Sequence, residues 1–410
     1  MGTMASSAKH KWTFRARFRR HAFGWRSQPA VKRVKEAVSE IKKVARKDPV
    51  LGGEGAVLFL EKVSPALERV DSSSGAIGRA VSNAIEALVS VIAEAPAEDT
   101  LREKWLERLW QAVQDDDMPY IEGLVDYWGD LCVTPERASR WADEFIRILR
   151  MVWRPDRRPG EYFKGDSACL SALYTARRYE EILELLELAP HKHWYYRKWG
   201  VRALVATGKS AEALSYAEDA RDRYDDPVGI AEACEAILLA EGLSERAYEL
   251  YALTANRRST YLATFRAIAA KYPEKDRADI LRDLIASTPG AEGKWFAAAK
   301  SECLYGVAIE LARRTPCDPR TLTRAARDLE EEEPRFAVEA GIAALRWLVA
   351  GYGYDITSLD VWAAYNHAMK AARNLGCEAE TRARIRDLVA GETFGERFVT
   401  KILGRELGLS

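Results

Sequence analysis

The sequence predicts an all-α fold, and three observations carry that prediction. Ala, Leu, Glu and Arg recur at helical spacing along the 410-residue chain, whereas runs of Val, Ile and Thr with a period of two residues are almost absent. Prolines such as Pro190, Pro227 and Pro334 fall between the periodic segments, where they end helices. A small or apolar residue also recurs about every thirty residues in the second half of the chain.

That recurrence predicts a repeat of helix pairs. The recurring residues are Ile182, Ala213, Ala247, Ile280, Ala308 and Ala340, at intervals of 31, 34, 33, 28 and 32 residues. Intervals near 34 residues are typical of tetratricopeptide-type arrays, in which each helix pair buries its remaining apolar surface against the next pair. We therefore expect residues 161–350 to form a right-handed α-solenoid of antiparallel, tetratricopeptide-like helix pairs. Tyr179–Ala189 is the second helix of one pair, and Gly208 and Gly242 lie in turns.

The segment before the repeats predicts a helical N-terminal domain over residues 29–153. Pro29 starts its first helix, which Asp48–Pro49 and Gly52–Gly53 end, and Thr134 caps its last helix. Further helices are expected at about 54–70, 76–95, 99–114, 119–131 and 135–152. The stretch Arg154–Gly160 has two prolines and no apolar period, which predicts a domain boundary. Residues 1–28 form an arm, and residues 351–410 a C-terminal cap with helices at about 358–375, 379–390 and 393–407.

Composition indicates a well-solvated helical protein of the cytoplasm. The chain is 48% hydrophobic and 30% charged. No apolar run approaches the roughly 18–20 residues of a membrane span, and the N-terminus lacks the apolar core of a secretory signal. The six cysteines are scattered without a C-x-x-C pair, so we expect small buried thiols in a reducing compartment rather than disulfides.

Charge is distributed unevenly although the chain as a whole is neutral. Residues 1–47 carry fourteen Lys or Arg against Glu36 and Glu40, a balance of +12, so the remaining 363 residues sum to −12. The cations of the arm alternate with Trp12, Phe14, Phe18, Phe23 and Trp25. Cations bind phosphates and aromatic faces stack on unpaired bases, so one interpretation is a DNA- or RNA-binding arm. Its candidate residues are Lys9, Lys11, Trp12, Arg15, Arg17, Arg19, Arg20 and Arg26.

Two other interpretations of the arm stay open. In one, the aromatic rings pack on the first helices while the arginines remain in water. In the other, an Arg-rich and acid-poor amphipathic head binds a membrane surface or serves as a targeting segment.

A second cluster of aromatic and basic residues predicts a surface for a protein partner. Its candidate residues are Tyr162, Lys164, Trp194, Tyr196, Arg197 and Lys198. The first helices of a repeat array line its inner face, where Arg197 and Lys198 would clamp an acidic group. The alternative is that the aromatic residues of this cluster belong to the core.

The remaining motifs favour structural roles over chemistry. Gly208–Lys209–Ser210 ends like a phosphate-binding loop, but Ala203 stands where such a loop needs glycine and no strand precedes it. His191 and His193 have no third ligand nearby in the sequence. Two acidic runs, Asp115–Asp117 and Glu330–Glu333, are expected to be solvated helix ends. We therefore expect no catalytic residues, no metal site and no cofactor.

Part of the chain resembles a family of uncharacterised bacterial α-helical-repeat proteins. The resemblance rests on Phe59–Val63, Val70–Gly78 and Trp110–Asp117 together with the repeat region, and it covers about residues 30–350. It implies a helical-repeat fold and a bacterial cytoplasmic setting, and no activity. The sequence as a whole therefore predicts a non-enzymatic scaffold or adaptor that binds a protein partner on its concave face. The alternative is a nucleic-acid-associated accessory protein that uses the basic arm.

Overall fold

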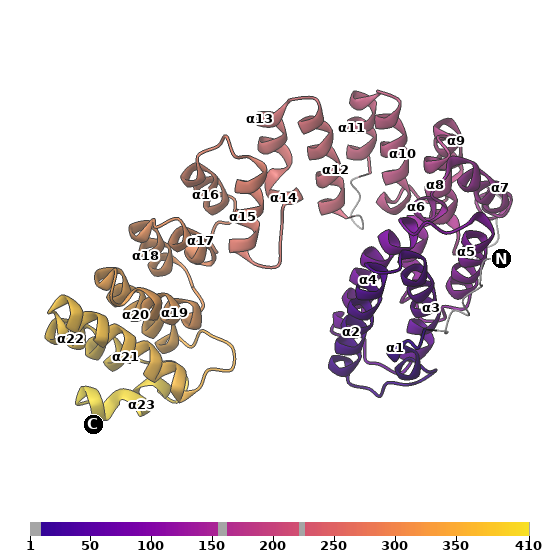
Figure 1. Cartoon of the computed structure of the whole chain (residues 1–410). Helices are drawn as coiled ribbons and strands as arrows, with labels where there is room; N and C mark the ends of the chain where they lie inside the picture. Colours follow the sequence, from indigo (N-terminus) through magenta and orange to yellow (C-terminus); the bar gives the residue numbers. More distant parts are fainter. Residues whose placement is uncertain (1–9, 155–161, 221–225, 410) are drawn as a thin grey trace. The chain divides into compact units, whose positions relative to one another are not determined.

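The computed structural model describes residues 10–154, 162–220 and 226–409, and their secondary structure is entirely helical. The predicted all-α class is confirmed. The chain divides into two compact units, residues 1–233 and residues 234–410, and Figure 1 labels the helices of both.

The first unit begins with long helices and continues with shorter pairs. Its elements are α1 (Thr13–Arg17), α2 (Ser27–Ala45), α3 (Pro49–Leu67), α4 (Ala76–Ala93), α5 (Asp99–Gln114), the 3-10 helix η1 (Glu122–Tyr127), α6 (Trp128–Cys132), α7 (Pro135–Val152), α8 (Asp166–Thr175), α9 (Tyr179–Leu188), α10 (Trp194–Ala206) and α11 (Ser210–Glu218). The next helix, α12 (Pro227–Ala240), continues from this unit into the second.

Helix α3 starts earlier than the sequence predicts. The Asp48 carboxylate caps it by accepting a hydrogen bond from the N–H of Leu51 at 2.9 Å. Gly52 and Gly53 therefore lie inside α3 and do not end a helix. A Cβ atom on Gly52 would stand 2.4 Å from the Cβ of Ala45, so the glycine serves close packing of helices rather than a turn.

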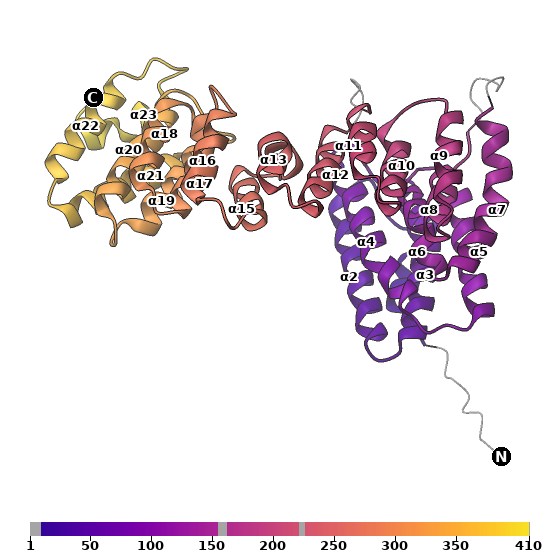
Figure 2. The same ribbon diagram turned by 90° about the horizontal axis from the view of Figure 1, so that it is seen from above.

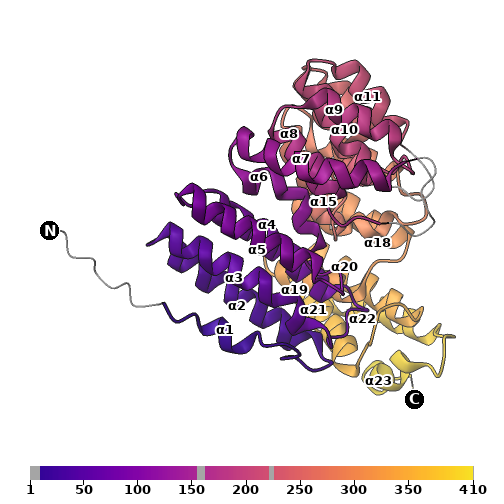
Figure 3. The same cartoon turned by 90° about the vertical axis from the view of Figure 1, so that its right-hand side faces the viewer.

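The arm is packed on the helices that follow it. The Trp12 ring covers Gly55, where a Cβ atom would stand 2.2 Å from the ring, and Phe14 and Phe18 both meet the ring of Phe59 edge-on. All three arm rings are at most 6% exposed. Figure 3 shows α1 lying beside α2 and α3. The packing interpretation of these aromatic residues is therefore confirmed.

Helix α4 has the length and composition of a membrane span, with 18 residues and a mean hydropathy of 1.4. Arg79 and Glu86 interrupt its apolar residues, so it is not the uninterrupted apolar run that the sequence analysis looked for. Its apolar residues lie on one face against α2 and α3, whereas Arg79, Ser82 and Glu86 lie on the exposed face. One-sided burial of this kind is typical of a core helix.

The segment expected to be one helix at 119–131 is divided between η1 and α6, and Asp116 fixes the turn that precedes η1. The buried Asp116 carboxylate accepts hydrogen bonds from the Ser64 hydroxyl and from the N–H of Ile121. Asp116 is therefore not a solvated residue, in contrast to the prediction for the acidic run.

The compact units divide the chain at a place different from the predicted boundary. Residues 155–161 lie outside the described residues, but the helices on either side, α7 and α8, pack against each other. The observed division falls after Ala233, inside α12.

The second unit consists of helix pairs and a short last helix. Its elements are α13 (Ser244–Ala247), the π-helical η2 (Tyr248–Ala252), α14 (Leu253–Ala255), α15 (Tyr261–Lys271), α16 (Arg277–Ala286), the 3-10 helix η3 (Glu292–Trp295), α17 (Phe296–Ser301), α18 (Tyr305–Arg314), α19 (Pro319–Leu329), α20 (Pro334–Val349), α21 (Ser358–Leu375), α22 (Glu378–Ala390) and α23 (Phe398–Leu407).

Five helix pairs are joined by the same turn. One residue in each turn has a left-handed backbone, with φ between 57° and 76°, and the N–H of the next residue donates to the carbonyl oxygen five positions earlier at 2.9 to 3.0 Å. This is the hydrogen bond of a Schellman motif. The left-handed residues are Arg177, Gly208, Gly242, Cys303 and Gly376. The structure thus repeats a local motif that the sequence showed only at its glycines.

The six recurring residues of the sequence are all buried with no exposed surface. In four of the five pairs with the shared turn, one of these residues lies five positions after the left-handed residue, as Ala213 follows Gly208. Thr381 stands in the same position after Gly376 and is 1% exposed. The pair α21–α22, which was expected to belong to a separate cap, therefore has the same turn as the pairs before it.

Candidate functional site

A groove in the second unit runs past α15, η3, α17, α19 and α21. It consists of two adjoining hollows of about 740 and 540 Å³, which share Asp318 and Arg324. Its walls are the first helices of three pairs, α15–α16, α17–α18 and α19–α20, together with α21.

Helix α19 supplies the central cations of the groove. The Asp318 carboxylate accepts from the N–H of Thr321 at 2.9 Å, and Pro319 occupies the first turn, so the helix start is well fixed. Leu322, Ala325 and Ala326 are buried on one side of the helix. The opposite side carries Arg320, Arg324 and Arg327, spaced so that all three project from one face.

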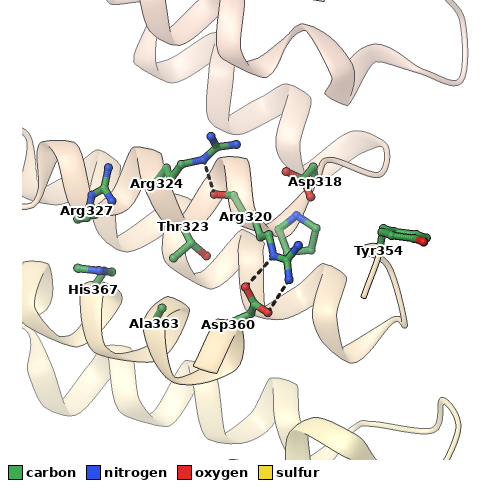
Figure 4. Close-up of a pocket in the computed structure, with 10 residues that line it drawn as sticks. Asp318, Arg320, Thr323, Arg324, Arg327, Tyr354, Asp360, Ala363 and His367 are labelled. Carbon is green, nitrogen blue, oxygen red and sulfur yellow. Dashed lines mark hydrogen bonds and ion pairs between the residues drawn. The ribbon is translucent and has the colours of Figure 1, made fainter. Parts of the chain in front are cut away.

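Arg320 forms an ion pair that fixes the start of α21. Its Nε and Nη2 donate to the two carboxylate oxygens of Asp360 at 2.7 and 3.0 Å (Figure 4). Nη2 also donates to the Asp355 carbonyl at 2.8 Å. The Arg320 guanidinium and the N–H of Thr357 keep the pKa of Asp360 well below its usual value. Because Asp360 also completes the capping box of α21 with Thr357, this ion pair is structural.

Arg324 lies four residues further on and has no such partner. Its guanidinium donates to the Arg320 carbonyl and the Thr321 hydroxyl, both at 3.2 Å, and no described carboxylate lies within ion-pair distance. Figure 4 shows Arg324 pointing away from α21, on the opposite side from Asp360. Its charge is therefore available to the shared part of the two hollows.

Two further cations face the larger hollow without a described carboxylate partner. Arg266 lies on α15 and Lys294 on η3, and both are exposed. The Lys294 Nζ lies 5.5 Å from the ring centroid of Tyr261, which also lines the hollow. Glu302, whose charge interacts with Arg266, is held by Arg277 through two hydrogen bonds. This hollow therefore combines unpaired cations with an aromatic surface, beside the helix-capping Asp318 and the Lys300–Asp328 ion pair.

At the far end of the groove, His367 contacts a charged pair that joins α19 to α21. The buried Glu330 carboxylate lies 2.7 Å from Nδ1 of His367 and accepts from Nζ of Lys370 at 2.6 Å. The acidic run does end a helix as predicted. The expectation that it is solvated was wrong for Glu330, which joins α19 to α21.

The cluster predicted to bind a protein partner is instead mostly internal to the first unit. Lys164 donates to three backbone carbonyls where α5 ends, at 2.7 to 3.1 Å, and Lys198 donates to Asp126 at 2.7 Å. Tyr196 donates to the buried Asp166 at 2.6 Å. The unpaired carbonyl oxygens at a helix end and buried carboxylates both need hydrogen-bond donors. Lys164, Tyr196 and Lys198 therefore stabilise contacts between elements of the first unit.

The other members of this cluster are also placed by internal contacts, with one exception. Trp194 is 8% exposed, and the buried Arg197 guanidinium lies 4.0 Å from the ring centroid of Tyr216. Tyr162 is 60% exposed, and its hydroxyl donates to Glu122. A clamp by Arg197 and Lys198 on an external acidic group is therefore not available in this structure.

The cations predicted for nucleic-acid binding divide into two groups. Arg17 pairs with Glu36 at 3.1 Å and Arg20 with Glu68 at 3.5 Å. The exposed members without a described carboxylate partner are Lys11, Arg15, Arg19 and Arg26. Lys9 lies outside the described residues, and Trp12 is buried, so Trp12 offers no face to a base.

The motifs that were set aside as structural have ordinary surroundings. Gly208 has φ of 76° and Lys209 pairs with Glu212 at 3.6 Å, as expected of an inter-helix turn. The rings of His191 and His193 lie 5.1 Å apart on an exposed segment. Among the described residues, no group of three or more His, Cys, Asp or Glu side chains has an arrangement that could hold a metal ion.

The sequence contained part of the signal for the groove. The spacing of Arg320, Arg324 and Arg327 predicts a basic stripe on an amphipathic helix. The sequence alone does not show that Arg320 forms an ion pair and that Arg324 does not. Arg266 and Lys294 belong to different pairs, and only their stacking brings them to one hollow.

Comparison of the chain with protein-family models, with curated proteins and with solved structures found no match. The resemblance to helical-repeat proteins therefore rests on the residues of the chain itself.

Proposed function

We propose that this protein is a non-enzymatic helical-repeat adaptor that holds an extended acidic segment of a partner protein in the groove of its second unit. The observation that carries the proposal is the set of three exposed cations, Arg266, Lys294 and Arg324, that face one hollow and have no described carboxylate partner.

The proposal includes a right-handed solenoid of antiparallel helix pairs, which the shared Schellman turns support. A turn that is the same in five pairs sets the same local geometry between two helices each time. Such pairs stack in order because each one leaves part of its apolar surface for the next. First helices then line one continuous surface, which suits an extended ligand better than a compact one.

The chemistry of the groove favours carboxylates as ligands. A guanidinium offers paired N–H donors that match the two oxygens of a carboxylate, and its charge strengthens each hydrogen bond. Exposed cations contribute more to the rate of association and to specificity than to affinity, so binding should weaken as salt increases. Tyr261 adds a flat surface for apolar atoms of the bound segment.

The test is titration of the full chain with a fluorescein-labelled, Glu-rich peptide of about twelve residues, followed by anisotropy. The double variant Arg266→Glu/Arg324→Glu should lose at least about tenfold in affinity, which corresponds to about 1.4 kcal/mol. A matched control is Arg386→Glu, an exposed arginine on α22 outside the groove. Equal affinity of the double variant and the wild type would overturn the proposal, as would equal binding of a Lys-rich peptide.

A further inference from the structure

A second basic groove lies in the first unit between α2 and α4, which pack side by side (Figure 2). Its volume is about 520 Å³, and four of its lining residues are the cations Lys35, Lys42, Lys43 and Arg46. All four are exposed, and no described carboxylate lies within ion-pair distance of any of them. None of them belongs to the arm in which the sequence suggested nucleic-acid binding.

These cations are unpaired because the carboxylates of α2 are used elsewhere. Glu36 accepts from Arg17 and Arg33 at 3.1 and 2.6 Å. Glu40 accepts from the backbone N–H groups of Thr13 and Phe14 at 2.7 and 3.2 Å. Docking of α1 therefore occupies both acids of α2 and leaves the edge of α2 that faces α4 positively charged.

We propose that this groove binds the phosphate backbone of a nucleic acid. Eleven residues separate Lys35 from Arg46, so the row of cations extends for about 16 Å along α2, a length that covers several successive phosphates. The four charges are complementary to such a row. Because the contacts are to phosphates and not to base edges, binding should be independent of sequence.

The packed arm carries further exposed cations in the same unit. Helix α1 packs against α2 and α3, and the exposed Arg15 and Arg19 belong to it or follow it directly. Trp25, two residues before α2, is 73% exposed, whereas the rings of Trp12, Phe14 and Phe18 are buried. Trp25 is therefore the arm ring best placed to stack on an unpaired base.

The groove suits a nucleic acid better than a membrane surface. Membrane-bound amphipathic helices present large apolar side chains beside their cations. Besides the four cations, the groove is lined by Ser39 and Asn83 and by the small apolar side chains of Val34, Val38, Ala80 and Ala84, and no Leu, Phe or Trp is among its lining residues. The surface is also recessed, which fits a strand rather than a flat bilayer.

The test measures binding of the full chain to labelled single-stranded DNA and to duplex DNA over a range of salt concentrations. The variant Lys42→Glu/Arg46→Glu should lose at least about tenfold in affinity, and its plot of log K against log salt should flatten by about 1.4 for a single strand and about 1.8 for a duplex. The matched control is Lys104→Glu/Arg147→Glu, which changes two exposed cations of α5 and α7 in the same unit.

Trp25→Ala should weaken single-strand binding and leave duplex binding unchanged. Thermal unfolding followed by circular dichroism checks that each variant is folded. The proposal is overturned if the groove variant and the control bind DNA equally, or if wild type binds vesicles with phosphatidylserine and not DNA. Because the peptide site lies on other residues, Arg266→Glu/Arg324→Glu should bind DNA normally, which separates this test from that of the proposed function.

Discussion

Basic side chains have opposite roles in two regions of this molecule. Around α8 and α10, Lys198 is bound to Asp126 and the buried Arg197 lies over Tyr216. Along α15, η3 and α19, Arg266, Lys294 and Arg324 are exposed and have no described carboxylate partner. Both regions combine aromatic and basic residues, so composition does not separate them. What separates them is whether each cation has a partner within the protein. Cations with a partner stabilise the fold, and cations without one can bind a ligand.

The polar network around α8 and α10 should give the largest measurable effect, through Asp166. Burial raises the pKa of Asp166 to about 6, from the 3.8 that is usual for an aspartate. The fold therefore favours the protonated acid, and stability contributed by this group is full below pH 3.8 and is lost as the pH rises to about 6. The resulting penalty at neutral pH is at most about 3 kcal/mol.

Asp166→Asn should remove that penalty. At pH 7.5 we expect the variant to be more stable than the wild type by up to about 3 kcal/mol, and near pH 4 the two should be nearly equal. Urea unfolding at both pH values measures the difference, with the exposed Asp117→Asn as a control. A difference in stability between Asp166→Asn and the wild type that is the same at pH 4 and pH 7.5 would contradict this account of Asp166.

A direct contrast between the two regions comes from neutralising one cation in each. Lys198→Met should destabilise the first unit by about 2 kcal/mol, because Asp126 then keeps a partly buried charge without its ammonium partner. Arg324→Met should change stability by less than about 0.5 kcal/mol, because Arg324 has no ion pair to lose. Urea unfolding of both variants decides the comparison. Equal effects would remove the distinction between structural and binding cations.

Salt dependence sharpens the same contrast at the level of binding. If Arg266 and Arg324 act as exposed binding charges, affinity for the acidic peptide should fall by several-fold as salt is raised about tenfold, since exposed charges are screened. The cation Lys198 is paired with the partly buried Asp126 of its own unit, so Lys198→Met should leave the peptide affinity unchanged at every salt concentration. Anisotropy titrations at several salt concentrations measure both, and loss of binding in the folded Lys198→Met variant would contradict this division.

The sequence predicted the helices well because their apolar period is local. The six repeat residues from Ile182 to Ala340 were recognised from their spacing alone, and all are fully buried. The prediction that Gly52 and Gly53 end a helix was wrong, because the sequence does not distinguish a glycine that permits close helix packing from one that ends a helix. Trp12 shows the same limit, since only the docking of α1 on Gly55 decides that its ring is buried.

The candidate site was less predictable for a physical reason. Arg197 and Arg324 both lie in helical patterns with aromatic or basic neighbours. The sequence predicted a partner-binding role for Arg197 and none for Arg324. Which of them is paired depends on acids and rings far away in the chain, such as Tyr216 for Arg197 and Asp360 for the neighbouring Arg320. Patterns within one helix do not contain that information.

The smallest expected effect concerns the turns that join the helix pairs. Gly242 has φ of 74° and no atom within 4 Å of an added Cβ, so Gly242→Ala tests the left-handed backbone alone. We expect it to destabilise the second unit by about 1 kcal/mol. Gly78 in α4 is equally open but has an ordinary helical backbone, so Gly78→Ala should stabilise by about 0.5 to 1 kcal/mol. Thermal unfolding of the two variants measures both, and a shift of the same sign in each would show that the shared turn does not depend on its left-handed residue.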